Sequence, residues 1–379
     1  LGELDASAFG SALVQAVVPL SAAQALQAFD ALSGEIHASA RALLFEDSGY
    51  MRQAVFGRLR SASYLGGGTD MTALAFGGPM LAYAATPAFP VKAPTKLASP
   101  IEGHDITFWA QDFGAWGGID GDGNAAEAKR TLSGIFAGVD TGVGATARAG
   151  LIAGYSHANI NVDARASSAR IDSFHVGAYG GTKVGAWNLR SGGAVIWHDI
   201  ATARSIQFPG FADQASTSYN GSTTQIFGEV GYGMTVGRIA AEPFADLAFV
   251  HIATNAFAEQ GGNAALAGAG SQTDIGYSTL GARAATNQAL PNAMVLTPRA
   301  ALAWQHAFGA ATPAQALSFL STNASFMVAG VPIARDSALV DVGFDVRLNP
   351  RATVGASYVG QLADHAHDHA LKGKFGWDF

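Results

Sequence analysis

The sequence predicts an all-β protein: a transmembrane barrel of about twelve antiparallel strands, preceded by a helical segment. From residue 105 to residue 379, apolar residues recur with a period of two, which is the repeat of a β-strand. Short and long connections alternate between these segments, as do the turns and loops at the two ends of a membrane barrel. Charged residues make up only 13% of the chain, which is too few to cover a soluble surface of this size.

The composition also excludes several classes of function. The net charge is −7 and there is no block of lysine and arginine, which argues against nucleic-acid binding. Without any cysteine, the chain can have no disulfide, no thiol catalysis and no cysteine-ligated metal. The most apolar stretch, residues 71–91, contains Pro79, Pro87 and Pro90 and therefore cannot form a straight membrane-spanning helix. Any membrane crossing must then be made by strands.

Residues 1–62 are the helical segment of this prediction. Ser21 is a suitable N-cap for the following run, which is rich in Ala, Leu, Gln and Arg. Gly34 and the Ser48–Gly49 pair are expected to divide the run into shorter helices, because glycine costs about 1 kcal/mol in a helix interior. Residues 63–104, which hold the prolines and many glycines, are expected to be a linker. Since the chain opens without Met or a signal peptide, we expect it to be part of a longer protein.

The barrel itself is expected over residues 105–379. Its clearest strand places Val342 and Phe344 on one face and Asp341 and Asp345 on the other, so that one face suits lipid and the other a polar lumen. Strands are expected near residues 106–117, 131–142, 146–158, 168–184, 186–207, 217–236, 239–257, 273–286, 294–309, 336–348, 351–362 and 369–379. Long connections are expected at residues 118–130, 208–216, 258–272 and 310–335. The first and last strands are expected to pair and close the barrel.

Five segments resemble the β-domain of autotransporters, the translocators of type V secretion. They are LSGEIHASA (32–40), FWAQDFGAWGG (108–118), EPFADLAF (242–249), ARDSALVDVGFDV (334–346) and KGKFGWDF (372–379). The resemblance implies a barrel in the outer membrane of a Gram-negative bacterium that supports export of an N-terminal passenger to the cell surface and anchors it. It also implies that a helix from within residues 22–62 threads the pore. The implied partners are outer-membrane lipid, the barrel-assembly machinery, periplasmic chaperones and the protein's own passenger. A monomer that binds no nucleic acid is expected.

Two sets of residues receive roles in this prediction. Phe375, Trp377 and Phe379 share one face of the last strand and resemble the outer-membrane assembly signal; the alternative is a lipid-facing aromatic girdle. We hypothesise that arginines of the helix pair with inward carboxylates and plug the pore; the alternative is that these arginines lie in solvent before the barrel. The expected contacts between lumen and helix are made by Arg41, Arg52, Arg58, Arg60, Glu229, Arg299, Asp341, Asp345 and Arg347.

Other chemistry is weakly supported. His365, His367 and His369 have the spacing of zinc or nickel ligands on a strand, but a solvated loop explains them more simply. No cofactor is expected, no catalytic residue is assigned, and the chain is not expected to be an enzyme, because it has no nucleophile elbow or Walker motif. The segment 20–62 contains no Asn, so cleavage of the passenger by the helix asparagine of the family is not expected. The alternative functions are a porin-like diffusion channel and, third, an outer-membrane hydrolase.

Overall fold

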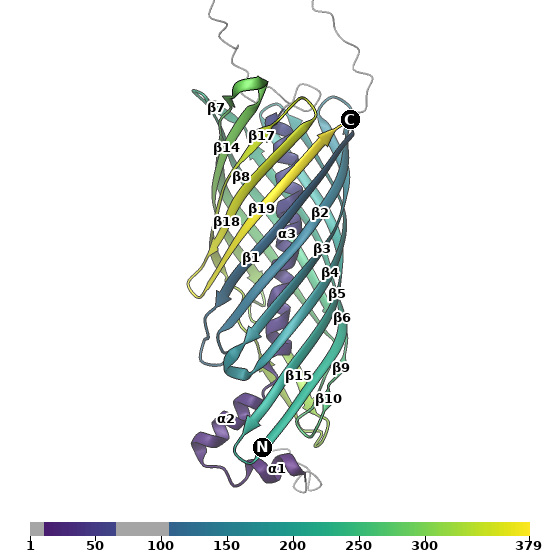
Figure 1. Ribbon diagram of the computed structural model, residues 1–379, viewed down its shortest axis with the longest axis vertical. Coiled ribbons are helices and arrows are strands. Elements are labelled where there is room, and N and C mark those ends of the chain that lie inside the picture. The colour runs from purple at the N-terminus through teal and green to yellow at the C-terminus, as the bar shows by residue number, and fades with distance from the viewer. Residues whose placement is uncertain (1–10, 66–105) are drawn as a thin grey trace, which may run out of the picture.

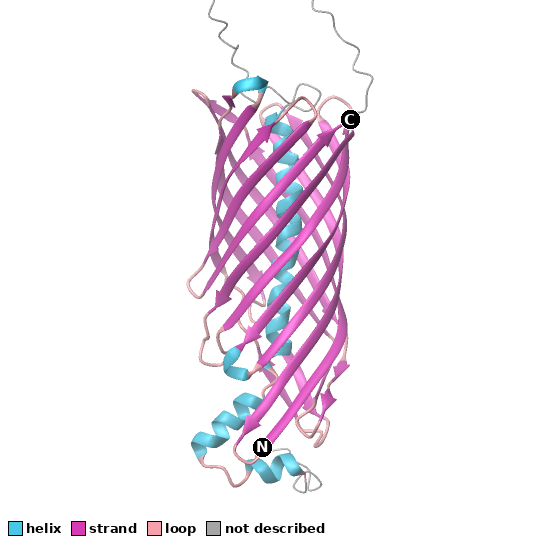
Figure 2. Ribbon diagram, in the orientation of Figure 1, coloured by secondary structure: helices cyan, strands magenta, loops and turns pink. Residues whose placement is uncertain are grey.

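The computed structural model describes residues 11–65 and 106–379, and in them a closed barrel surrounds a central helix (Figures 1 and 2). The helices are α1 (Ala12–Val17), α2 (Ala22–Leu32) and α3 (Glu35–Leu65), with short 3₁₀ turns at Asp163–Arg165 and Pro291–Ala293. The twelve barrel strands are β1 (Ile106–Ile119), β2 (Ala128–Val143), β3 (Ala147–Val162), β4 (Ser167–Val184), β5 (Trp187–Phe208), β6 (Phe211–Tyr232), β8 (Ile239–Thr254), β12 (Ser271–Ala285), β14 (Val295–Gly309), β17 (Asp336–Arg347), β18 (Ala352–Leu362) and β19 (Ala366–Asp378). The predicted fold class and strand number are therefore confirmed.

Barrel closure is made by the first and last strands, as the sequence predicts. Strand β1 pairs antiparallel with β19 from Thr107–Asp378 to Ile119–Ala366. The amide of Phe379 adds a hydrogen bond of 3.0 Å to the carbonyl oxygen of Ile106. Every barrel strand consequently has two neighbours, and no long edge is left unpaired in a lipid environment.

Side chains alternate between the outer surface and the lumen along each strand. Leu151, Leu247 and Leu302 point outward and are 62%, 67% and 64% exposed, as suits lipid-facing residues. Arg148 and Ser156, on the opposite face of the Leu151 strand, are buried in the lumen. Among the described residues, no helix is long and apolar enough to cross a membrane.

The helical segment follows the sequence prediction at one glycine and departs from it at another. Ser21 caps α2 in a capping box with Gln24, and Gly34, with a φ of +64°, separates α2 from α3. The expected break at Ser48–Gly49 is wrong, because α3 runs unbroken for 31 residues. Ser48 Oγ donates to the carbonyl oxygen of Phe45 within the helix at 2.6 Å. Packing against the barrel wall stabilises a helix that local propensity alone would interrupt.

The long connection expected at residues 208–216 is also wrong. Strands β5 and β6 continue to a tight turn in which Phe208 pairs with Phe211 and Gly210 has a φ of +80°. This hairpin extends beyond the other strands, and α1 and α2 pack on it through Leu13, Ala28 and Leu32 against Ile206, Phe208 and Ala215. Its outward residues are mostly polar because that part of the hairpin extends past the apolar band, so the apolar alternation that marks a membrane strand is missing.

The two ends of the barrel differ in their connections. At one end lie the short turns and the C-terminus; at the other lie α1, α2 and the long connections (Figure 1). Short strands in the long connections are β9 (Phe257–Ala258), β10 (Gln260–Gly261), β11 (Leu266–Gly268), β15 (Ala314–Phe319) and β16 (Ser325–Ala329), and at the short-turn end β7 (Met234–Val236) and β13 (Gln288–Ala289). Strands β16, β15, β11 and β9 form a separate small sheet. The linker expected at 63–104 lies outside the described residues, except for positions 63–65, which belong to α3.

Close approach of α3 to the barrel wall generates the first prediction. A Cβ atom on Gly177 would lie 2.7 Å from the carbonyl oxygen of Gly193 and 2.8 Å from Met51 Cε, whereas one on Gly142 would meet nothing within 4 Å. We expect Gly177→Ala to lower the free energy of unfolding by about 1–3 kcal/mol, because backbone must move to admit the methyl group. Urea unfolding followed by tryptophan fluorescence measures the change, with Gly142→Ala as control. Equal stabilities for the two variants would contradict the packing described.

Candidate functional site: the helix-filled lumen

The lumen is the candidate site, because helix α3 runs along it and brings helix and wall side chains together. One side of α3 lies close to β4, where Gly177 and Gly181 leave room for Met51 and Leu59. Met51 and Leu59 are both buried. Glycine on the inward face of a strand permits this approach, since any side chain there would push the helix away.

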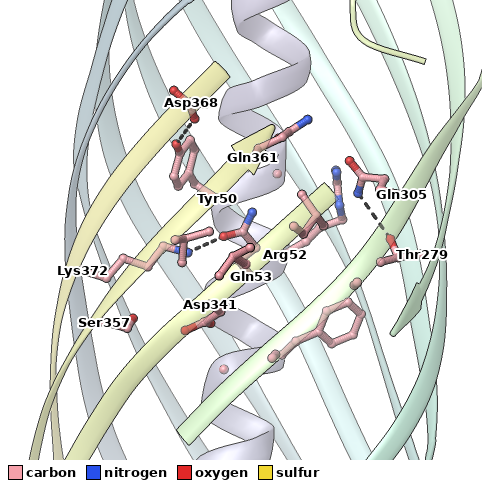
Figure 3. A pocket seen from close by; sticks show the side chains of 18 of the residues that line it. Tyr50, Arg52, Gln53, Thr279, Gln305, Asp341, Ser357, Gln361, Asp368 and Lys372 are labelled. Atoms are coloured by element: carbon pink, nitrogen blue, oxygen red, sulfur yellow. Dashed lines mark hydrogen bonds between the residues drawn. The ribbon is translucent and has the colours of Figure 1, made fainter. Parts of the chain in front are cut away.

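On its other side, α3 faces a cavity of about 190 Å³ bounded mainly by β12, β14, β17, β18 and β19. Polar side chains project into it from the helix and from the wall (Figure 3). The hydroxyl of Tyr50 donates to Asp368 at 2.6 Å, and Lys372 Nζ donates to Gln53. Longer side chains therefore span the wider gap on this side of the helix.

A five-membered charge network surrounds the last turns of α3 near the short-turn end. Arg190 lies 2.7 Å from both Glu229 and Glu242, and Arg283 lies 2.7 Å and 2.6 Å from the same two carboxylates. From the helix, Arg60 adds an ion pair with Glu229. Three cations thus share two carboxylates in a site where the two glutamates are almost fully buried. Removing one member of such a network is strongly destabilising, because it leaves a buried charge without its partner.

A second anchor of α3 lies beside the first strand. Arg58 donates two hydrogen bonds to Asp140, of 2.6 and 2.9 Å, in the fork geometry typical of arginine and carboxylate. Asp140 also accepts from Arg148 Nε at 2.8 Å and from the hydroxyl of Tyr179 at 2.8 Å. Trp109 Nε1 in turn donates to Tyr179 at 2.6 Å. The carboxylate is therefore fixed by the wall as well as by the helix.

The first turns of α3 are held by the connections at the long-loop end. His37 Nε2 lies 2.8 Å from Glu259 Oε1, and Arg204 donates to both oxygens of Glu259 at 2.8 Å. The hydroxyl of Ser39 accepts from the amide of Val331 at 3.1 Å. Glu259 and Val331 belong to two different long connections, so these connections pack over the start of the helix.

Two acidic residues in the middle of α3 also pair with the wall. Glu46 lies 2.5 Å from Arg130, and Asp47 accepts from Ser156 Oγ at 2.6 Å. The same hydroxyl lies 2.9 Å from His175 Nε2. Sequence reasoning considered only the arginines of the helix and missed these carboxylates. In the sequence, the only sign of these helix carboxylates as lumen contacts is that Glu46 and Asp47 are consecutive.

The four predicted arginines of the helix all lie in the lumen, with different partners. Arg60 reaches Glu229, one of the three carboxylates named from the sequence, and Arg58 instead binds Asp140. Arg52 donates to Gln225 and Ser48, and Arg41 donates to Gln315 and Thr273. Two of the four therefore use neutral partners, which sequence patterning did not identify.

The remaining predicted lumen charges belong to the wall. Asp341 and Asp345 are engaged by barrel cations, and no described side chain of the helix pairs with either: Arg299 lies 3.0 Å from Asp341 and 3.7 Å from Asp345, and Lys374 lies 2.7 Å from Asp345. Arg347 lies near the short-turn end of β17 and lines a smaller cavity beside Arg58.

The aromatic and histidine candidates lie on or near β19. Phe375 and Phe379 are exposed, on the outward face that suits either an assembly signal or a girdle, and Trp377 shares that face in the alternation of the strand. The rings of His367 and His369 are 5.7 Å apart, and His369 Nδ1 lies 2.7 Å from the hydroxyl of Tyr358. His365 is exposed in the short connection before β19. In the part of the chain that the structure describes, no group of three His, Asp or Glu side chains is placed to hold a metal ion.

Comparisons with known proteins agree with this architecture. The family model of the autotransporter β-domain matches residues 108–359. Two extracellular serine proteases of Serratia marcescens are 32% and 31% identical over 359 and 353 residues, which is 95% and 93% of this chain. The chain spans only 31% of the length of each relative. The resemblance inferred from the sequence is confirmed.

Solved structures show the same fold. The translocator domain of the autotransporter NalP from Neisseria meningitidis superposes with a TM-score of 0.58 at 18% identity, covering 74% of this chain and 90% of that chain. The β-domain of the Bordetella autotransporter BrkA gives a TM-score of 0.55 at 18% identity, covering 73% and 100%. At this identity the likeness establishes the barrel fold.

The five-membered network generates the second prediction. We expect Glu229→Gln to lower the free energy of unfolding by about 3–5 kcal/mol, because it leaves Arg60, Arg190 and Arg283 with a single carboxylate, Glu242. Urea unfolding in detergent micelles measures the loss.

The matched control for this prediction is Asp163→Asn, which breaks an exposed ion pair with Lys129. The side chain of Asp163 is 71% exposed and that of Lys129 is 64% exposed. That change should cost less than about 1 kcal/mol. A Glu229→Gln loss no larger than that of the control would show that the network does not stabilise the barrel.

Proposed function

Because this chain belongs to the autotransporter β-domain family, we propose that α3 stays in the pore as a plug once its passenger has been exported. The domain is an outer-membrane translocator of a Gram-negative bacterium: it inserts as a β-barrel, supports export of an N-terminal passenger to the cell surface and anchors that passenger. The orientation of α3 supports the proposal, since its N-terminal end lies at the long-loop end and its C-terminal end at the short-turn end.

The observation that carries the proposal is the double anchoring of α3 near the short-turn end. Arg58 and Arg60 form ion pairs with Asp140 and Glu229, whose side chains are fully buried. Ion pairs in a water-poor lumen are weakly screened, so salt in the medium should not release them readily. The His37 and Ser39 contacts hold the other end of the helix.

The passenger is proposed to be an extracellular serine protease, as the names of the two Serratia relatives state for those proteins. This chain covers 31% of their length, so the protease activity is assigned to the passenger and no enzymatic role is given to the barrel. Within this chain, residues 1–62 are proposed to be the passenger end, 63–104 a linker and 105–379 the translocator.

Insertion is proposed to use the aromatic residues at the end of β19. Phe375, Trp377 and Phe379 would be read as an assembly signal by the barrel-assembly machinery, after delivery by periplasmic chaperones. Support comes from the position of Phe379 at the closing seam, where its amide bonds to Ile106. The translocator is proposed to act as a monomer with a single lumen.

Surface export gives the third prediction. An epitope placed before residue 1, behind a signal peptide, should be digested when intact Gram-negative cells are treated with protease. Deleting Phe379 should abolish this digestion, because the barrel would fail to insert. An epitope that stays protected in cells whose barrel is inserted would overturn the translocator function and favour the diffusion channel.

The plug gives the fourth prediction. In planar bilayers, the wild-type barrel should remain closed for most of the recording, and the double variant Arg58→Gln, Arg60→Gln should open at least about tenfold more often, equivalent to roughly 1.4 kcal/mol. The control is Arg238→Gln with Arg351→Gln, which removes two exposed cations at the same end of the barrel. A wild type that conducts steadily, with a variant that behaves alike, would support the porin-like alternative.

A further inference from the structure

Three strands carry the same outward pattern near the long-loop end: an aromatic residue followed two positions later by histidine. The pairs are Tyr155 and His157 on β3, Phe249 and His251 on β8, and Trp304 and His306 on β14. Residues two apart on a strand share a face, and these side chains are all on the outer surface of the barrel. The translocation function makes no use of them, since they do not face the lumen.

Each of these histidines lies directly opposite an aspartate on the next strand. The cross-strand partners are His157 with Asp172, His251 with Asp274, and His306 with Asp336. The distances from histidine Nδ1 to aspartate Oδ1 are nearly the same in the three pairs, 2.8, 2.7 and 2.8 Å. Three pairs of one geometry on three separate hairpins form a repeated unit, which we call the histidine–aspartate belt.

In two of the units, the aromatic residue also donates a hydrogen bond to the aspartate. The hydroxyl of Tyr155 donates to Asp172, and Trp304 Nε1 donates to Asp336 at 3.0 Å. On the other side of each aromatic, along the same strand, lie the exposed leucines Leu151, Leu247 and Leu302. On β3 and β8 the unit therefore stands where the strand leaves the apolar band. On β14 the exposed Phe308 follows, with its ring centroid 4.6 Å from that of His306, so this histidine lies within the aromatic layer. Aromatic rings prefer the level of the lipid headgroups.

Two residues along a strand correspond to roughly 7 Å, so His157 and His251 lie one step beyond their aromatic neighbour, toward the long-loop end. In an autotransporter barrel this end faces the cell surface, and the lipid in contact with the belt is that of the outer leaflet. We propose that the histidine–aspartate belt binds phosphate groups of outer-leaflet lipids through His157, His251 and His306.

The chemistry of the pair suits a phosphate ligand. Aspartate engages Nδ1 of each ring. Among the residues that the structure describes, Nε2 of His251 and His306 has no other partner, whereas Nε2 of His157 lies 3.1 Å from the amide nitrogen of Asn159, which the phosphate displaces in that unit. A protonated imidazole donates from both nitrogens, so it bridges an aspartate on one side and a phosphate oxygen on the other. Arg170, outward on β4 two residues from Asp172, supplies a permanent cation beside the first unit.

The test compares unfolding in two kinds of vesicle at pH 6. One contains phosphatidylcholine with one fifth diphosphoryl lipid A, and the other contains the same lipids after enzymatic removal of the phosphates. Wild-type protein should unfold at a higher urea concentration in the phosphorylated vesicles. The triple variant His157→Gln, His251→Gln, His306→Gln should lose at least half of that gain.

Single variants provide the matched control. His306→Gln should reduce the gain, and His365→Gln, which changes an exposed histidine in the β18–β19 connection, should leave it intact. Inorganic phosphate added to the phosphate-free vesicles should give no comparable gain, because the proposal commits to lipid-borne phosphate. The proposal is overturned if the triple variant keeps the wild-type gain, if the wild type shows none, or if free phosphate reproduces it. An equal loss of stability in both vesicles would also overturn it, by assigning the histidines a purely structural role.

Discussion

Closure of the sheet is the constraint on which the rest of the molecule depends. A bilayer offers no water to backbone amides and carbonyls, so each must find its partner within the protein. The register between β1 and β19, from Thr107–Asp378 to Ile119–Ala366, satisfies the groups that would otherwise be exposed at two edges. Closure also fixes the size of the lumen, since strand number and stagger together determine the width of a barrel. Twelve strands leave a space that a helix can occupy.

The filled lumen then explains where the charges lie. Charged side chains are expensive on a lipid-facing surface, and the inward faces receive many of them. Once inside, each charge loses water and needs a close partner, which is why Asp140, Glu229 and Glu259 are each held by more than one group. The same need for close partners explains why α3, which is buried on several sides, carries both arginines and carboxylates that pair with the wall. Its apolar residues, such as Met51 and Leu59, occupy the side where wall glycines allow contact.

Local pattern was sufficient to predict the strands, their order and the closing pair. That success has a physical cause: the lipid face must be apolar, and a period of two is visible in a single strand such as β17. The same signal failed in the β5–β6 hairpin, because the residues beyond the bilayer have no reason to be apolar. The Ser48–Gly49 break failed because helix propensity describes an isolated helix, whereas α3 is supported on several sides.

Partners across the lumen were harder to predict than the strands. Inward orientation of Asp341, Asp345 and Glu229 follows from alternation, but which cation meets which carboxylate depends on strand stagger and on the rotation of α3. Neither quantity is written in a local stretch of sequence. Arg60 and Glu229 are 169 residues apart, and Arg58 and Asp140 are 82 apart. Consequently the sequence could name the charged faces and could not assign most of the pairs.

The wall charges near the short-turn end are balanced even without the helix. Arg190 and Arg283 already match Glu229 and Glu242, and Asp140 already has Arg148 and Tyr179. Arg60 and Arg58 join these groups without being needed to neutralise them. These wall charges near the short-turn end therefore keep partners of opposite charge when the pore is occupied by some other segment. That property suits the proposed plug, in which α3 occupies the pore once the passenger has been exported. The greater electrostatic need lies with the helix arginines, because Arg58 and Arg60 meet Asp140 and Glu229 only when α3 is in register.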